Sequence, residues 1–282
     1  MPGRGNALTR KDGWLRTFSE TRIHNCLKSH PMLRLFTTFY LETDPLRRRE
    51  YEECLRRNLA CMAIDEICLL LEGDGVQLPE SPKLRVSKIP VRPTYDDFIR
   101  WINEVAMPDD ISVVANTDIW FDGSIGVVTP RMGIRECYAL ARWDGERLND
   151  RNDSQDCWVF RGKVEGVRGD FPLGVVRCDN RILYELQQAG YRVLNPAFAI
   201  RTTHLHAGVR GEYADTEDHF IQPPYRYLWP HNLLGPLGTC WHNLRFPHQK
   251  LGWHFDRRKA ARTLPVRVIR KLAQLAMCST KG

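Results

Sequence analysis

The sequence lacks the features that mark secreted, membrane-spanning and zinc-stapled proteins. Its nine cysteines are an odd number and include no C-x-x-C pair, and several lie in apolar runs, such as Cys61, Cys68 and Cys137. This usage is typical of buried, reduced thiols and indicates a reducing compartment. No apolar run reaches the roughly 18 residues of a membrane span, the first residues hold no signal-peptide core, and no internal repeat is present. We therefore expect a cytoplasmic protein.

The chain has no net positive charge outside the C-terminal tail. The 282-residue chain has a net charge of +7, but residues 241–282 hold ten Lys and Arg against one acid, so the remainder carries −2. This distribution argues against a nucleic-acid-binding body. The tail predicts a helix around Val268, Leu272 and Leu275 with basic residues beside them. Such a helix either lies on the inner face of an anionic membrane or packs on the domain with its basic side in solvent.

Strand and helix patterns alternate through the chain. The helix expected from residue 45 has Asp44 as its N-cap and Pro45 at its first position, and a Thr94–Asp97 capping box opens the next one. A third helix spans residues 179–190, with Asp179 as its N-cap. The expected strands are residues 32–42, 64–75, 83–91, 111–115, 135–144, 154–162 and 191–206. This order predicts an α/β fold with a parallel sheet covered by helices.

Polar residues follow several of these strands. Asp118 comes directly after the apolar strand 111–115, and ligands of parallel sheets bind at the carboxyl ends of strands. We therefore expect Asp118 to face a cleft. Asp122 is a weaker candidate, because acids in turns are usually solvated. His204 and His206 share one face by strand alternation.

Six motifs occur in a fixed order: NTD, ARWD, SQDCWVFRG, CDNR, AGYRVLNP and THLHAG, after the segments LRRNLA, IDEICLLLE and RPTYDDF. In this order they resemble a family of small GT-A-type glycosyltransferases with bacterial and viral polysaccharide-modifying members. The likeness covers roughly residues 32–213. It implies a GT-A-like Rossmann-type mixed sheet flanked by helices, a nucleotide-sugar donor, a glycan or other hydroxyl acceptor, and a divalent metal on a DxD-type motif. The domains expected are an N-terminal extension (1–30), a catalytic domain (31–225), and a Pro-rich connector with a basic helical tail (226–282).

The resemblance makes Asp118 the expected metal ligand. Mg²⁺ or Mn²⁺ with oxygen ligands stabilises the charge of a departing diphosphate. The first acid of the DxD pattern is Asn116 here, which can bond a ribose hydroxyl but adds no charge. A neutral His204 or His206 would complete the site and favour Mn²⁺ over Mg²⁺. The alternatives are a turn cap for Asp118 and a core position for either histidine.

Two aspartates are candidates for the catalytic base. Inverting transfer needs a carboxylate that takes the proton of the acceptor hydroxyl as the sugar is attacked from the opposite face. Asp179 is the first choice, since a helix N-terminus would lower its pKa and keep it ionised. The same position suits an ordinary helix cap. Asp156, which precedes the apolar run 157–160, is the second choice.

Four further residues are expected to hold the donor. Thr38 and Glu72 end the first two strands, where the fold places the base and ribose, and Trp143 suits stacking on a sugar, although tryptophan in a strand is often core. Arg181 is a diphosphate partner, unless it lies on an exposed helix face. Two other classes stay open. One is a metal-dependent phosphoester hydrolase, which would need more carboxylates; the other is a non-catalytic nucleotide-sugar or polyanion-binding protein.

Overall fold

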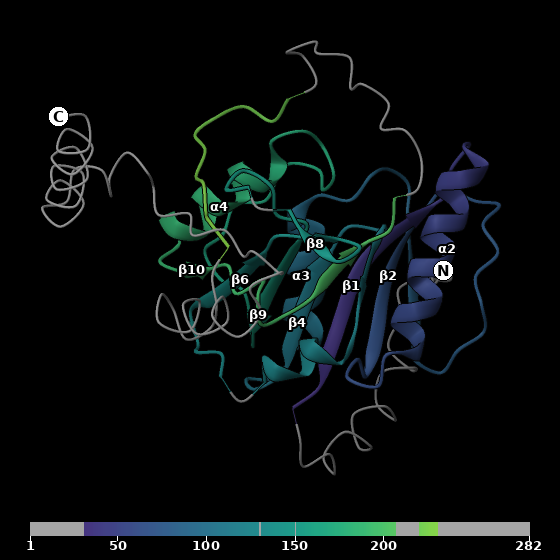
Figure 1. Ribbon diagram of the computed structural model, residues 1–282, viewed down its shortest axis with the longest axis horizontal. Coiled ribbons are helices and arrows are strands. Elements are labelled where there is room, and N and C mark those ends of the chain that lie inside the picture. The colour runs from purple at the N-terminus through teal and green to yellow at the C-terminus, as the bar shows by residue number, and fades with distance from the viewer. Residues whose placement is uncertain (1–30, 130, 150, 207–219, 231–282) are drawn as a thin grey trace, which may run out of the picture. The chain divides into compact units, whose positions relative to one another are not determined.

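The computed structural model describes residues 31–129, 131–149, 151–206 and 220–230 (Figure 1). The chain divides into two compact units, Met1–Pro31 and Met32–Gly282, and every element below belongs to the second. The expected extension 1–30 and the basic helix of the tail, with its predicted membrane contact, lie outside the described residues. Within these described stretches, no helix is long and apolar enough to cross a membrane.

A seven-stranded mixed sheet forms the centre of the domain. Its order is β10-β6-β9-β4-β1-β2-β3, and all neighbours run parallel except the two pairs that contain β9. This arrangement confirms the predicted GT-A-like Rossmann-type mixed sheet. The strands are β1 (Leu33–Tyr40), β2 (Glu66–Glu72), β3 (Leu84–Ile89), β4 (Ile111–Ala115), β6 (Glu136–Leu140), β9 (Cys157–Arg161) and β10 (Arg192–Leu194).

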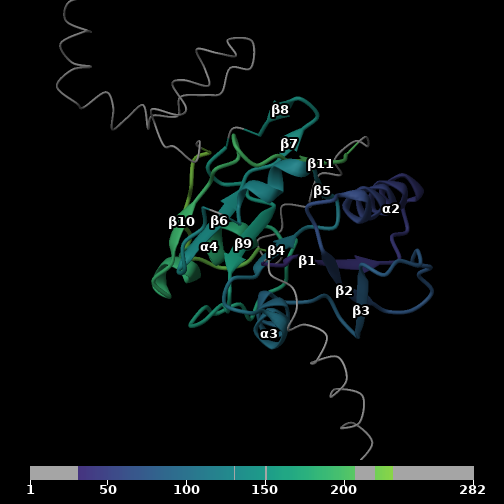
Figure 2. The same cartoon turned by 90° about the horizontal axis from the view of Figure 1, so that it is seen from below.

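Helices cover both faces of this sheet. In Figure 2, α2 (Pro45–Ala60) and α3 (Tyr95–Val105) lie on opposite sides. Leu35 of β1 belongs to the core cluster with Leu55 of α2, whereas the adjacent Phe36 belongs to the cluster with Phe98 of α3 and Leu183 of α4 (Cys178–Gln188). Because both faces of the sheet are covered, successive residues of β1 and β4 are buried, rather than every second one.

Local signals fixed the starts of two helices as predicted. The Asp44 side chain accepts a hydrogen bond from the Leu46 amide at 2.8 Å, and Thr94 and Asp97 form the complete capping box of α3. Each cap satisfies amides that have no partner within their own helix. The cysteines within the described residues are free and buried, also as predicted: Cys54, Cys61, Cys68, Cys137, Cys157 and Cys178.

A second, smaller sheet has the order β5-β11-β7-β8. Its strands are β5 (Ile119–Phe121), β7 (Trp143–Asp144), β8 (Arg147–Leu148) and β11 (Thr202–His204). The prediction of one strand over 135–144 and another over 191–206 is wrong, because each segment contributes first to the large sheet and then to the small one. The Asn195 side chain accepts a bond from the Ala141 amide at 3.1 Å where both segments change sheet. As a result His204 pairs with Asp144.

Residues 220–230 pack along the start of α4. The amides of Ile221 and Arg226 donate to the carbonyls of Val176 and Asn180 at 3.0 and 2.9 Å. Leu228 and its neighbours continue this contact, since the Leu228 carbonyl accepts from the Gln155 side chain at 3.2 Å. The first part of the expected Pro-rich connector therefore packs on the domain without a break at residue 225.

Asn58 of α2 positions β5 through its buried side chain. Its amide nitrogen donates to the Ile119 carbonyl at 2.9 Å, and its oxygen accepts from the Phe121 amide at 3.0 Å. Asn58→Ala should lower the free energy of unfolding by about 2–4 kcal/mol, since it leaves two buried backbone groups without partners. Urea titration measures this loss.

A matched control for this substitution is Asn103→Ala. Asn103 makes the same pair of bonds with the backbone of Val164, both at 2.8 Å, on α3. Both variants should lose stability, but only Asn58→Ala should weaken ligand binding next to β5. Equal binding by the two variants would contradict the positioning role of Asn58.

Candidate functional site

Asp118 lies in the turn between β4 and β5 and forms an ionic cluster with Arg47, Asp144, His204 and His206. Its Oδ2 accepts from Arg47 Nη2 at 2.8 Å and from His204 Nε2 at 3.1 Å. His204 Nδ1 contacts Asp144 Oδ1 at 2.9 Å. The strand ends bring together, as expected, the acid and both histidines singled out in the sequence. We call these five residues the ionic cluster.

The residues of the ionic cluster stabilise one another's charged forms. Burial opposes ionisation of Asp118, but the hydrogen bond and charge of His204, with those of Arg47, outweigh it and lower the Asp118 pKa to about 2. Burial likewise opposes protonation of His204, and Asp118 overcomes it so that the His204 pKa is raised. A protonated His204 donates from both ring nitrogens, to Asp118 and to Asp144.

His206 is in a different state from His204. Burial and the charge of Arg47 lower the His206 pKa, which keeps the ring neutral. Arg47 Nη1 lies 2.6 Å from His206 Nδ1, so Nδ1 accepts and Nε2 carries the proton. The two imidazoles stack with 5.4 Å between ring centroids, which confirms that they share a face. His206 Nε2 is buried and has no hydrogen-bond partner within the part of the chain that the structure describes.

The predicted metal ligands Asp118 and His206 both contact the guanidinium group of Arg47. Within residues 31–206 and 220–230, apart from the undescribed gaps, no three His, Cys, Asp or Glu side chains are arranged to hold a metal ion. Instead the Arg47 guanidinium bridges Asp118 Oδ2 and His206 Nδ1. Carboxylate oxygen and neutral imidazole nitrogen are the donors that Mn²⁺ takes. Asp118 and His206 therefore fit a divalent cation in their chemistry, on condition that Arg47 leaves.

The two candidate bases form a second group, the acid pair Asp156 and Asp179. Asp156 is buried and accepts from Asn116 Nδ2 at 3.0 Å, with Arg142 Nη1 at 3.4 Å. Asp179 Oδ2 accepts from the Gln155 amide at 3.3 Å. Because β9 pairs antiparallel with β4, its first residues lie at the same edge of the sheet as Asp118.

The structure corrects two expectations about Asp179. It is not the N-cap of α4: that position is Arg177, whose φ of 71° is left-handed, and Asp179 lies in the first turn. Its pKa is raised to about 7, not lowered, because of burial and then the charge of Asp156. Burial also raises the Asp156 pKa, against the opposing charge of Arg142. The helix dipole is the weaker effect at this position.

Arg142 links the acid pair to the ionic cluster. Its guanidinium lies 3.4 Å from Asp156 Oδ2 and 3.3 Å from Asp144 Oδ1. The sequence reasoning missed both Arg142 and Arg47. Arg142 stands inside the ARWD motif, which was a usable signal. Arg47 is one of three consecutive arginines, and only the packing of α2 reveals which of them turns toward Asp118.

Thr38 and Glu72 meet at the carboxyl ends of β1 and β2, as their positions predicted. Thr38 Oγ1 contacts Glu72 Oε1 at 2.7 Å. Thr117 Oγ1 donates to the Thr38 carbonyl at 3.0 Å and ties the turn that carries Asp118 to the end of β1. Asn116, which replaces the first acid of the DxD pattern, bonds Asp156 in this arrangement.

The other expected ligand residues have different surroundings. Trp143 is buried, its indole N–H donates to the Ala197 carbonyl at 2.8 Å, and its ring lies in a small core cluster. Arg181 bonds Glu185 at 2.8 Å and the carbonyls of residues 222 and 223. Asp122 accepts from the Ser124 amide at 2.9 Å and caps a turn. The contacts of these three side chains are made without any residue of the ionic cluster.

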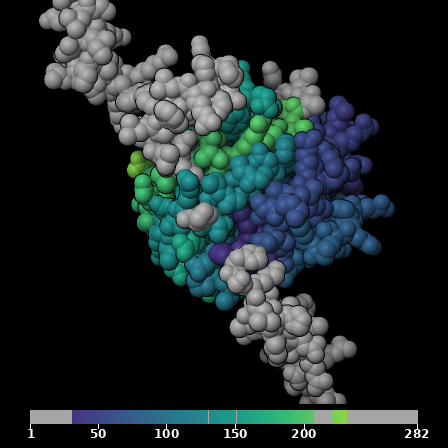
Figure 3. Space-filling view, turned by 60° about the horizontal axis from the view of Figure 1, so that its bottom comes forward, coloured from purple at the N-terminus to yellow at the C-terminus, as the bar shows by residue number. Residues whose placement is uncertain are grey.

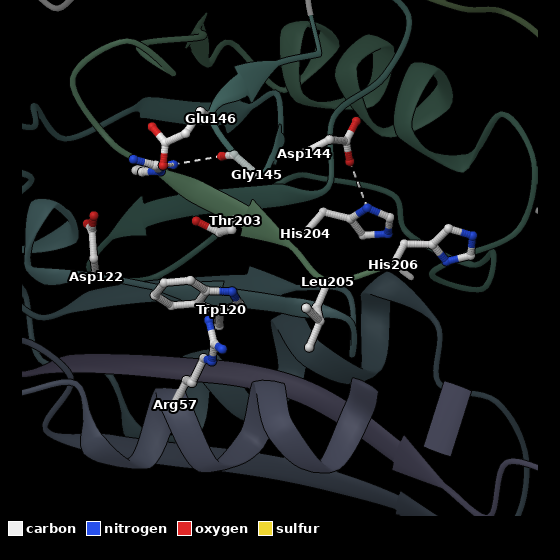
Figure 4. Close-up of a pocket in the computed structure, with 11 residues that line it drawn as sticks. Arg57, Trp120, Asp122, Asp144, Gly145, Glu146, Thr203, His204, Leu205 and His206 are labelled. Atoms are coloured by element: carbon white, nitrogen blue, oxygen red, sulfur yellow. Dashed lines mark hydrogen bonds and ion pairs between the residues drawn. The ribbon is translucent and has the colours of Figure 1, made fainter. Parts of the chain in front are cut away.

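A pocket of about 430 Å³ opens beside the ionic cluster. Figure 4 shows Asp144, His204 and His206 on one side of it and Trp120 with Arg57 of α2 on another. In the space-filling view, the green surface of the segment that leads into β11 lies against teal and blue surface from much earlier in the chain (Figure 3). Four separate parts of the sequence line the pocket: Arg57 of α2, Trp120 and Asp122, residues 144–146, and the segment from Arg201 to His206.

The fold class and the site together define a GT-A-like α/β domain with two groups of charged residues at one edge of its sheet. No family model matches the sequence, and comparison with curated proteins found no match either. One similar solved structure is a 4-diphosphocytidyl-2C-methyl-D-erythritol synthase, with a TM-score of 0.37 and 12% identity, where the match covers 65% of this chain and 96% of that chain.

A second synthase of the same name, from Anaerococcus prevotii, has a TM-score of 0.29 and 11% identity. That match covers 50% of this chain and 63% of the other, so the chain spans less than two thirds of that enzyme. These values describe a distant likeness of the backbone fold.

Proposed function

We propose that the protein is a glycosyltransferase that moves a sugar from a nucleoside-diphosphate sugar to a hydroxyl of a glycan or other acceptor. The observation that carries the proposal is the meeting, at one edge of the sheet, of the ionic cluster around Asp118 with the acid pair Asp156 and Asp179, which Arg142 connects. Their surroundings lower the pKa of Asp118 and raise that of Asp179. Carboxyl groups whose surroundings push their pKa values apart are suited to different roles. Asp118 is a permanent anion, and Asp179 exchanges a proton near neutral pH.

Asp179 serves as the base in this proposal. It takes the proton of the acceptor hydroxyl while that oxygen forms a bond to the anomeric carbon of the donor. The bond between this carbon and the diphosphate oxygen breaks, and its electrons leave with the nucleoside diphosphate. Attack from the face opposite the diphosphate inverts the configuration of the sugar. Asp156 raises the proton affinity of Asp179 and is the alternative base.

The departing diphosphate needs positive charge, which the ionic cluster provides. Arg47 and a protonated His204 both lie on Asp118 and are suited to diphosphate oxygens. When Arg47 turns to the diphosphate, Asp118 Oδ2 and His206 Nδ1 become free to hold Mn²⁺ or Mg²⁺. Such a cation would act as a Lewis acid on the leaving group. His204 would then keep Asp118 in position from the side.

The nucleoside is proposed to lie over the ends of β1 and β2. Thr38 and Glu72 offer a hydroxyl and a carboxylate there, which suit the hydroxyls of a ribose or the edge of a base. Asn116 and Arg142 hold Asp156 in place, and we assign them to the support of the acid pair. The tail remains proposed as a contact with anionic membrane.

A panel of nucleotide sugars tests the proposal. The full chain is incubated with each donor, with Mn²⁺, with Mg²⁺ and with chelator, and the released nucleotide is identified by mass spectrometry. Release of nucleoside diphosphate, by transfer or by slow attack of water, is expected for at least one donor. Release of nucleoside monophosphate or pyrophosphate would instead indicate attack at phosphorus. Donor binding without any product would mean a binding protein, and either outcome would overturn the proposal.

A further inference from the structure

A groove leads away from the ionic cluster across β5. It consists of the 430 Å³ pocket beside the cluster and a second pocket of about 390 Å³, and both are lined by Arg57, Trp120 and Asp122. Each pocket lies in the range of about 300–1,000 Å³ that is usual for small-molecule sites, so the two together have room for a short chain of sugar rings. We call it the Trp120 groove.

Three residues that line this groove each have a buried polar atom without a hydrogen-bond partner among the described residues: Trp120 Nε1, Thr203 Oγ1 and His206 Nε2. Thr203 is only 6% exposed, and Figure 4 shows it directly above Trp120, with His204 and His206 to its right. Buried polar groups are nearly always bonded, and an unbonded one costs about 1–3 kcal/mol. Three such atoms along one groove indicate a ligand with hydrogen-bonding groups.

The charges of the Trp120 groove indicate which ligand it suits. The first pocket has two guanidinium groups, Arg57 and Arg201, and three carboxylates, Asp122, Asp144 and Glu146. The second pocket adds Arg56. The positive and negative groups are balanced, so a polyanion gains nothing from this surface. Sugar hydroxyls both donate and accept, and therefore pair with guanidinium, carboxylate and indole N–H alike.

We infer that the Trp120 groove binds the acceptor, and that this acceptor is an oligosaccharide of neutral or amino sugars. The inference rests on the proposed function for the reaction, because the inner end of the groove is formed by Asp144 and His204 of the ionic cluster. Arg142 joins Asp144 to Asp156 of the acid pair. The sugar at the inner end presents its hydroxyl for transfer, and the units beyond it lie along Trp120.

The test measures binding of the purified full chain to an array of neutral, amino and sulfated oligosaccharides of increasing length. Neutral or amino oligosaccharides should bind, with affinity that increases with length, and sulfated ones should not. Trp120→Phe removes the unbonded N–H and keeps an aromatic ring beneath Arg57, whose guanidinium lies 4.6 Å from the indole centroid. It should weaken binding about five- to tenfold, the usual effect of one lost hydrogen bond.

Two further variants exclude a purely structural explanation. Thr203→Val removes the unbonded hydroxyl at nearly constant volume, so it should weaken glycan binding to a similar degree without lowering the melting temperature. Trp101→Phe is the matched control, since Trp101 of α3 packs on Phe36 at 5.8 Å in the other core cluster. It should bind glycan as the wild type does.

Glycan and nucleotide are measured separately, so that the two proposals can fail separately. No binding by any oligosaccharide, binding by sulfated ones alone, or wild-type affinity in both Trp120→Phe and Thr203→Val would overturn the acceptor groove. If nucleoside diphosphate is released while no glycan binds, the groove is wrong and the glycosyltransferase proposal stands. If glycan binds with the expected losses and no nucleotide sugar is bound or cleaved, the groove stands and the glycosyltransferase proposal is wrong.

Discussion

Asp179→Asn should reduce sugar transfer by about 10²–10⁴-fold, the usual contribution of a positioned base. The amide is nearly the same size as the carboxyl group, and its oxygen can keep one of the two contacts with the backbone amides of Gln155 and Asn180, whereas its NH2 group cannot accept the other. Donor binding should therefore persist. Transfer kinetics and calorimetric donor titration on the same preparation measure both quantities. Asp170→Asn, at an exposed aspartate earlier in the loop before α4, is the matched control.

The rate of sugar transfer should also depend on pH in a defined direction. Below its pKa of about 7, Asp179 is protonated and cannot accept a proton, so transfer should rise with pH through about 7 and then level off. The raised pKa also means that the unfolded chain gives up this proton at lower pH than the folded one. The stability that Asp179 contributes is therefore present below the ordinary carboxyl range and is lost as pH rises through about 7.

A variant without the ionisable group at position 179 should not lose this stability as the pH rises. At pH 8, Asp179→Asn should be more stable than the wild type, by up to about 4 kcal/mol if the whole shift counts, and at pH 4 the two should be alike. Thermal melts across this range measure the difference. A variant that transfers sugar at nearly the parental rate, with no gain of stability at pH 8, would refute Asp179 as the base and direct attention to Asp156.

Asp118→Asn should abolish transfer, by about 10³-fold or more, together with the Mn²⁺-dependent part of nucleoside-diphosphate affinity. The carboxylate is the anion shared by Arg47 and His204, and the neutral amide removes the charge between them, although Arg47 keeps its ion pair with Glu50 and His204 its contact with Asp144. Manganese binding by electron paramagnetic resonance and nucleotide binding by calorimetry report on the site independently of turnover. Metal dependence equal to that of the wild type would exclude Asp118 as a ligand.

Arg47→Met provides the companion measurement for the cation site. Arg47 holds the two lone pairs, on Asp118 and His206, that a divalent cation would use. Its removal should therefore tighten Mn²⁺ binding, by about tenfold if the competition costs about 1.4 kcal/mol. Unchanged Mn²⁺ affinity in this variant would mean that the cation binds elsewhere, and that Arg47 alone meets the diphosphate.

The sequence predicted best what depends on neighbours along the chain. The caps at Asp44 and Thr94, the two-sided burial of β4 and the position of Asp118 after that strand all follow from local patterns. The shared face of His204 and His206 follows from strand alternation.

Properties set by distant neighbours could not be predicted in the same way. The Asp179 pKa depends on Asp156, which belongs to another element, so a rule based on the helix dipole gave the wrong sign. The segments 135–144 and 191–206 both pass from the large sheet to the small one where Asn195 bonds Ala141, and no periodicity of the sequence reveals this bond. Arg47 could not be told apart from Arg48 and Arg49 either, because only the packing of α2 shows which of the three faces Asp118.

Helix α2 sets the distance between the ionic cluster and the Trp120 groove. Along α2, Arg47 belongs to the ionic cluster, Asn58 holds β5, and Arg57 lies over Trp120 in the groove. A single inserted residue between Arg47 and Asn58 would rotate the two ends relative to each other by about 100°. The side chains would remain the same, but they could no longer face both ligands at once. The number of residues in α2 between Arg47 and Asn58 therefore determines whether the ionic cluster and the groove can serve one reaction.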